Sequence, residues 1–161
     1  MGRHAYGTTR VLQLSAARSK RRAVAQGAGG SGVGLMMVLE IESGVTLDDV
    51  AFTLRSLNLP SEVDRNIWGG VLPGCRCGFG LKQHAVPLAL GARGIPVEWS
   101  VGLTMTFHFR AAHMLRSLHE IYRLIEVFAA QHRHRFVLSF QYERIYAVRD
   151  KAGLDLVWKI S

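Results

Sequence analysis

The alternation of apolar and polar residues after residue 35 predicts a strand followed by a helix. From Leu35 to Glu42, apolar residues occupy one set of alternating positions, which is typical of a half-buried strand. Thr46 has the character of a helix N-cap, and apolar residues then recur at helical spacing as far as Leu57. This helix is amphipathic, so we expect it to lie on another layer of the protein.

Glycine and proline residues break the segment 61–96 into short pieces. We expect four short elements there: a helical turn near Glu62 to Trp68, strands at Val71–Leu72 and Cys77–Leu81, and a loop tip at 91–94. Beyond them, residues 97–109 alternate between apolar and polar side chains, which predicts a long strand.

The last third of the chain predicts a long helix and then more strands. Residues 111–133 contain no Gly or Pro, and their apolar residues repeat at intervals of three and four. Residues 135–149 are expected to be extended, a turn follows at 150–153, and residues 154–160 alternate as a final strand. The order of elements predicts an α+β fold, with a mainly antiparallel sheet and two helices packed on one face.

Positive charge is concentrated at the start of the chain. Residues 1–35 contain six Lys or Arg and no Asp or Glu, whereas residues 36–161 contain fourteen basic and twelve acidic residues. The formal charge of +8 is therefore +6 in the first segment and +2 in the rest. A basic chain suggests a nucleic-acid or membrane partner, but a nearly neutral domain behind a basic leader does not. We favour the second interpretation.

The first 35 residues are rich in Gly, Ala and Ser, and we expect a flexible leader ahead of a single α+β domain at 36–161. The alternative is an over-extended start, with Met36 or Met37 as the true first residue, because the composition changes abruptly there. No apolar run is long enough to cross a bilayer, and two cysteines do not make a disulfide framework. These features favour a cytoplasmic protein.

Cys75, Cys77 and His84 are the candidate reactive residues that lie closest together in the sequence. They could begin a zinc site, but a structural zinc site needs four ligands and no second cysteine pair exists. We therefore expect two small, partly buried thiols and no metal or cofactor. Five of the seven histidines lie between residues 108 and 134, at spacings that do not share one helix face. No nucleophile or phosphate-loop motif is present in the sequence.

The three tryptophans are expected in two kinds of environment. Trp99 and Trp158 continue apolar strand faces, which favours packing in the core. Trp68 precedes two glycines in a segment that we expect to be a loop. An exposed tryptophan is a frequent anchor in protein interfaces, so Trp68 is a candidate partner-binding residue.

The segment 94–160 resembles a known class of bacterial protein in its general pattern. A strand that begins Gly-Ile-Pro-Val-Glu-Trp at 94–99 leads to the long helix, and FVLSFQYERIYAVRDKAGLDLVWKI follows at 136–160. This is similar to the small immunity proteins that bacteria encode beside polymorphic or contact-dependent growth-inhibition toxins. The resemblance implies a protein that is not an enzyme, and that binds one cognate toxin domain, frequently a nuclease, and blocks its active site.

Inhibitors of nucleases are commonly acidic, because they contact a surface that is built to bind phosphate. The domain as a whole departs from that expectation, but its acidic residues are concentrated near its start. They either form a local patch that contacts a basic toxin surface or belong to an ordinary solvated helix and strand edge. The candidate partner-binding acids are Glu40, Glu42, Asp48, Asp49, Glu62 and Asp64.

Three hypotheses follow from the sequence. The first is a cytoplasmic immunity protein that neutralises a cognate toxin, with a nuclease domain as the expected partner. The alternative is a nucleic-acid-binding module that uses the basic leader as an arm on phosphate, which predicts strong salt dependence. The third is a small enzyme that uses Cys75, Cys77 and His84, with zinc as its metal.

Overall fold

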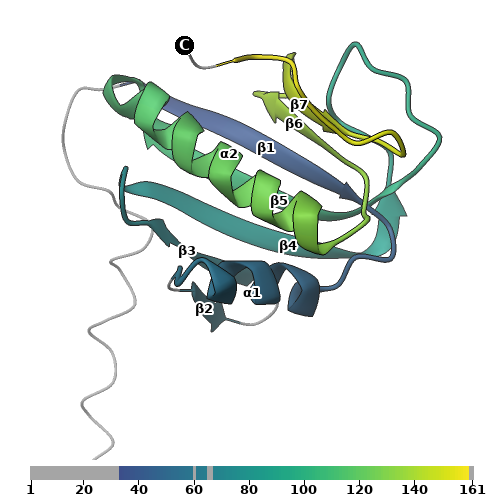
Figure 1. The fold of residues 1–161 in the computed structure, drawn as a ribbon, viewed down its shortest axis with the longest axis horizontal. Helices are drawn as coiled ribbons and strands as arrows, with labels where there is room; N and C mark the ends of the chain where they lie inside the picture. The colour runs from purple at the N-terminus through teal and green to yellow at the C-terminus, as the bar shows by residue number, and fades with distance from the viewer. Residues whose placement is uncertain (1–32, 60, 65–66, 160–161) are drawn as a thin grey trace, which may run out of the picture. The chain divides into compact units, whose positions relative to one another are not determined.

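The computed structural model describes residues 33–59, 61–64 and 67–159, and these residues form strands and two α-helices (Figure 1). The leader expected at 1–35 lies almost entirely outside the described residues. The elements are β1 (Gly34–Glu42), α1 (Leu47–Ser56), β2 (Ser61–Asp64), β3 (Ile67–Leu72), β4 (Cys77–Leu88), β5 (Val101–Arg110), the short 3-10 helix η1 (Ala111–His113), α2 (Met114–Gln131), β6 (Phe136–Phe140), β7 (Arg144–Arg149) and β8 (Leu154–Leu156).

All the strands of the described part belong to one sheet, in the order β2-β3-β4-β5-β1-β6-β7-β8. Each neighbouring pair is antiparallel. Apart from the β2–β3 hairpin, the central elements follow the order β1-α1-β4-β5-α2-β6, which is the β-α-β-β-α-β arrangement of ferredoxin-like folds. The structure therefore confirms an α+β fold with an antiparallel sheet.

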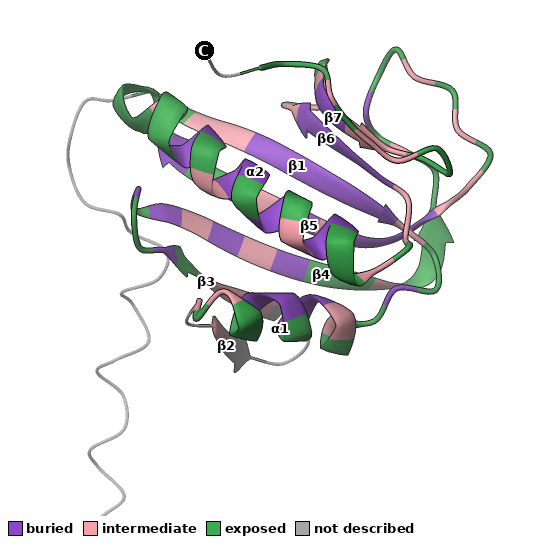
Figure 2. Ribbon diagram, viewed as in Figure 1, coloured by how far each residue is buried: buried purple, intermediate pink, exposed green. Residues whose placement is uncertain are grey.

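Both helices cover the same face of this sheet, and the hydrophobic core lies between the two layers (Figure 2). Met37 and Leu39 of β1 point into it, together with Phe107 of β5, and each is at most 1% exposed. The stripe of α2 that faces the sheet includes Leu118 and Ile125, which are fully buried. Burial of each such side chain contributes about 1.5–3 kcal/mol, so this layer accounts for most of the stability.

The start of α1 is fixed by a reciprocal pair of hydrogen bonds. The backbone N–H of Asp49 donates to Thr46 Oγ1 at 3.2 Å, and the N–H of Thr46 donates to Asp49 Oδ2 at 2.8 Å. This capping box satisfies two backbone donors that the first turn would otherwise leave without partners. The expectation that Thr46 is the N-cap is therefore confirmed.

Two expectations for the middle of the chain are wrong. The segment from Glu62 to Trp68 is not a helical turn, because β2 and β3 form a hairpin that adds to the edge of β4. The long strand begins at Val101 rather than at residue 97, and residues 89–100 form an irregular loop (Figure 1). Whether each segment becomes a strand depends on pairing with a neighbouring strand, and the pattern of apolar residues carries no information about that pairing.

The segment 135–149 is a hairpin rather than one extended stretch. Gln141 and Tyr142 have φ values of 50° and 62°, and the N–H of Glu143 donates to the Phe140 carbonyl at 2.9 Å. Two successive residues with positive φ make a tight turn within the three-residue connection 141–143 between β6 and β7. Because neither residue is Gly or Asn, the usual sequence signature of this turn is missing. The turn places Tyr142 beside the face of the sheet that carries no helix.

Candidate functional site

A pocket of about 750 Å³ opens on the helix-free face of the sheet. We call it the sheet pocket. Its walls come from β1, β4 and β5, from the irregular loop that follows β4, and from the β6–β7 turn. This volume is within the usual range for binding sites. The polar residues that line it and carry the argument are Glu40, Lys82, His84, Arg93, Thr104 and Tyr142.

Glu40 is the buried acid of the sheet pocket, and only 4% of it is exposed. It lies on β1 between Leu39 and Ile41, and because side chains alternate along a strand it faces away from the helices. The N–H of Gly91 donates to Oε1 at 2.7 Å, and the N–H of Ala92 donates to Oε2 at 2.9 Å. The carboxylate therefore ties the loop after β4 to the centre of the sheet.

The Tyr142 ring closes one side of this arrangement. A Cβ atom added to Gly91 would lie 2.9 Å from the ring of Tyr142 and 3.0 Å from Glu40 Oε1, so no side chain fits between them. The N–H of Arg93 also donates to the carbonyl oxygen of Tyr142, at 2.7 Å. Burial, and then the charge of Glu40, raise the pKa of the Tyr142 hydroxyl above its usual value. The ring is therefore a neutral hydrogen-bonding surface at physiological pH.

His84 and Thr104 make the polar contact on the strand side of the pocket. His84 Nε2 lies 2.8 Å from Thr104 Oγ1, within hydrogen-bond distance. Burial and the neighbouring Lys82 lower the pKa of His84, although the charge of Glu40 acts in the opposite direction. The imidazole is therefore neutral at pH 7. Together these groups offer hydrogen-bond donors and acceptors that are held in fixed positions.

The candidate acidic residues do not share one surface. Glu40 lies in the sheet pocket, whereas Glu42 accepts two bonds from Arg135, from the backbone N–H and from Nε, each at 2.7 Å. Asp48 is exposed in the first turn of α1. Glu62 and Asp64 belong to β2, and their side chains lie outside what the structure describes. Counting Asp49, three of the six are already bound within the fold by named partners.

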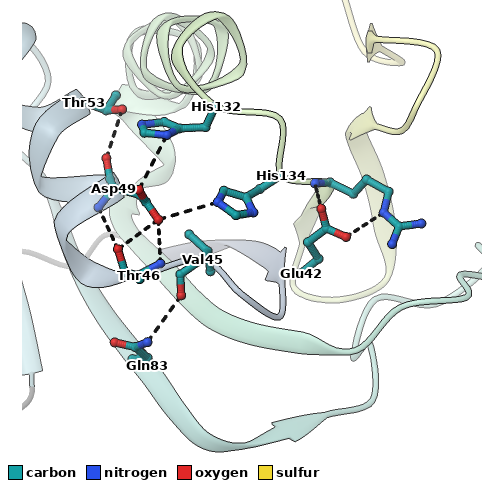
Figure 3. Close-up of polar contacts among 9 residues, drawn as sticks. Glu42, Val45, Thr46, Asp49, Thr53, Gln83, His132 and His134 are labelled. Atoms are coloured by element: carbon teal, nitrogen blue, oxygen red, sulfur yellow. Dashed lines mark hydrogen bonds and ion pairs between the residues drawn. The ribbon is translucent and has the colours of Figure 1, made fainter.

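Asp49 lies in a polar cluster where α1 meets the end of α2 (Figure 3). Its carboxylate oxygens are 3.8 Å from His132 Nδ1 and 3.6 Å from His134 Nε2. Burial raises the pKa of Asp49, but hydrogen bonds from Thr46 and the two imidazoles outweigh it, and the net pKa is lowered. Asp49 is therefore the acidic partner of Thr46 in the capping box of α1 rather than an unbound acid.

The tryptophans differ from expectation in their environments. Trp68 is not in a loop: it lies in β3, opposite Leu81 of β4, and packs half-buried against the core. Trp158 is 44% exposed, and its ring stacks on Tyr146 with centroids 5.6 Å apart. Trp99 lies half-buried in the irregular loop before β5 rather than on a strand face. Trp68 is therefore a weaker candidate for a partner-binding anchor than the sequence indicated.

The two thiols and His84 lie on opposite sides of the sheet. Cys75 and Cys77 are buried on the helix-covered face, whereas His84 lines the sheet pocket. Burial and the neighbouring thiol raise the pKa of Cys77 to about 12. The zinc or enzyme site proposed from these three residues is therefore excluded by their geometry. Within the described residues, no group of three His, Cys, Asp or Glu side chains is arranged to hold a metal ion.

The sheet pocket contains several residues that the sequence did not single out, above all Thr104, Tyr142 and Arg93. They come from three segments that are far apart in the chain, and no local motif joins them.

Among the residues described, neither helix is both long enough and apolar enough to cross a membrane. No protein-family profile, curated protein or solved structure matches this chain. The resemblance to immunity proteins therefore remains a prediction.

Proposed function

We propose that this chain is a cytoplasmic partner-binding protein, without catalytic activity, that recognises its partner with the sheet pocket. The observation that carries the proposal is that hydrogen bonds hold the polar side chains of the pocket in defined positions. Both oxygens of Glu40 accept backbone hydrogen bonds, and His84 is in contact with Thr104. Groups held in this way can bind a complementary surface without rearrangement.

The resemblance of residues 94–160 to immunity proteins supplies the class of partner. Under this proposal the partner is a cognate bacterial toxin domain, expected to be a nuclease, and binding covers its active site. Nanomolar inhibition corresponds to about 12 kcal/mol, which a few well-packed residues around a pocket can supply. Leu88 and Val86 are 48% and 72% exposed at the end of β4, and Leu88 also lines the pocket. These apolar side chains would extend the contact surface.

A capture experiment with two matched variants tests the surface as well as the partner. The tagged full-length chain is expressed in its native host and washed at high salt, beside Thr106→Trp and His119→Trp. Thr106 lines the sheet pocket and His119 is exposed on α2, so the same ring is added to opposite faces. We expect one protein in stoichiometric amount with the wild type and with His119→Trp, and at least tenfold less with Thr106→Trp.

The same experiment separates the proposal from its alternative. Nucleic acid that is released by salt, with no retained protein, would favour the nucleic-acid-binding module with its basic leader. Equal capture by Thr106→Trp and the wild type would exclude the helix-free face as the contact surface.

A further inference from the structure

Glu40 is an unusual acid because it is buried and forms no ion pair with a cationic side chain of the described residues. The ion pairs formed within the described residues use the carboxylates of Asp49 and Glu42 instead. Glu40 is balanced by two backbone N–H groups, and it is 4% exposed. Buried charges in proteins are normally paired with an opposite charge, because removal from water is costly. Because Glu40 lines the sheet pocket, a positively charged group of another molecule can approach it there.

The pocket also has a wall that suits a cation. Tyr142 and Glu40 both line the sheet pocket, and the backbone of Gly91 packs against both of them. A positive group is attracted to the face of an aromatic ring, and the attraction is stronger where water is excluded. A carboxylate has about four lone-pair sites, so Glu40 can accept further hydrogen bonds besides the two from the backbone.

We propose that the sheet pocket receives an arginine side chain of the partner protein, whose guanidinium group pairs with Glu40. This inference rests on the proposed partner-binding function and specifies the chemistry of the contact. Arginine fits better than lysine because its planar guanidinium presents several donors in a fixed geometry to the remaining lone pairs of a carboxylate. A nuclease surface that binds phosphate displays such side chains, so occupying the pocket would remove one of them from its substrate.

The charged residues at the rim set the direction of approach. Lys82, Arg93 and Glu143 line the pocket and are exposed, so solvent screens their charges. Glu40 lies in a region of low dielectric, where its attraction for a cation is much stronger. Lys82 and Arg93 at the rim therefore weaken the attraction of Glu40 for a single cation without cancelling it.

A pair of small probes tests this chemistry on the wild-type protein. The isotopically labelled full-length chain is titrated with N-acetyl-arginine methylamide, and separately with the citrulline analogue, which replaces the guanidinium by a neutral urea of the same shape. We expect saturable shifts of the Gly91 and Ala92 amide resonances with the arginine probe, and none at Leu118 in the core. The citrulline probe should bind at least tenfold more weakly. Equal binding of the two probes, or no binding of either, would overturn the proposal.

Titration of two variants with the arginine probe provides a second, independent test. Glu40→Gln keeps an acceptor oxygen for the backbone but removes the charge, and we expect at least a tenfold loss of arginine binding. Glu143→Gln removes an exposed acid at the same pocket and should change binding less than threefold. A larger loss with Glu143→Gln than with Glu40→Gln would also overturn the proposal. The comparison of arginine with citrulline needs no variant, so it decides the matter even where Glu40→Gln fails to fold.

The capture experiment distinguishes failure of this inference from failure of the proposed function. If Thr106→Trp abolishes capture of the partner while Glu40→Gln does not, the helix-free face remains the contact surface and the arginine contact is wrong. If both variants capture the partner normally, the contact surface itself is wrong. Loss of capture with both variants, together with arginine-selective binding, is the result that we expect.

Discussion

The two faces of the sheet are organised in different ways. On the helix-covered face, alternate residues of the central strands β1, β4, β5 and β6 are apolar and pack against α1 and α2. On the helix-free face, a buried acid, a neutral imidazole and hydroxyl groups surround an open pocket. The first face is specified by periodicity that repeats along each element. The second is specified by contacts between segments that are distant in sequence, such as the 51-residue separation between Glu40 and Gly91.

This difference shows where stability and recognition are located in the molecule. Removing water from the covered face supplies the free energy of folding, and almost any apolar side chain of the right size would serve there. The free face carries fewer of the core residues, and Glu40 and His84 there are held in position by hydrogen-bond partners. Substitutions on the two faces should therefore change different measured quantities.

The largest effect is expected from truncation of a core residue, with its strand neighbour as the control. Phe107→Ala removes a fully buried ring from the covered face and should lower the free energy of unfolding by about 3–5 kcal/mol. Thr106→Ala, on the other face of β5, should change it by less than about 0.5 kcal/mol. Urea denaturation of the full chain measures both. Similar losses for the two variants would show that the faces do not differ in this way.

The next effect concerns the loop that Glu40 holds on the free face. Gly91→Ala places a methyl group against Tyr142 and Glu40, so we expect a loss of about 1–3 kcal/mol and weaker binding of the arginine probe. Gly78→Ala is the control, because an added Cβ there meets no atom within 4 Å. It should be neutral or stabilising by up to about 1 kcal/mol. Urea denaturation and amide resonances report the two effects, and a neutral Gly91→Ala would contradict the tight contact.

The same contrast explains how much of the fold the sequence could predict. The strand at β1, both helices and the Thr46 cap depend on residues that are close in the chain, and each was predicted near its actual position. The β2–β3 hairpin depends on pairing with β4, and the segment from Glu62 to Trp68 contains no pattern that distinguishes it from a helical turn. Prediction from the sequence therefore succeeds for elements that depend on local interactions, because only these leave a periodic pattern of apolar residues.

The site was harder to predict for the same reason. Glu40 was a candidate, but as one of several surface acids rather than as a buried group that holds a loop. Tyr142 reaches the pocket only because of a turn with two positive φ values, in a sequence without Gly or Asn. The charge pattern indicated a patch of acids, yet Glu42 and Asp49 have partners within the fold that come from the far end of α2 and beyond.

A smaller effect is expected where the helix layer itself depends on charge. Asp49→Asn should lower the free energy of unfolding by about 1 kcal/mol at pH 7, because it weakens the capping box of α1. Asp48→Asn, in the same turn but outside the cap, should cost less than about 0.5 kcal/mol. Denaturation at several pH values provides a further check. An equal effect of the two variants at pH 7 would contradict the role of the cap.

The sign of the pH dependence follows from the lowered pKa of Asp49 in the folded protein. A carboxylate whose pKa is lower when folded stabilises the protein above its unfolded pKa and loses that contribution as the pH falls through the folded value. The difference between wild type and Asp49→Asn should therefore be greatest above pH 5 and should shrink as the pH falls below about 4. A difference that grows toward low pH would show that Asp49 is not stabilised in its charged form.

The last prediction concerns the cysteines of the covered face, which we expect not to react with a thiol reagent in the folded protein. Cys75 and Cys77 are 4% and 0% exposed, and burial raises the pKa of Cys77 to about 12, so neither should react with a thiol reagent at pH 8 in the folded protein. Both should react in urea, and His119→Cys on the exposed surface of α2 should react at once. Reaction of the native thiols at the rate of His119→Cys would mean that the covered face opens readily. In that case the two faces would no longer differ in access, and the cysteines would again be candidates for chemistry.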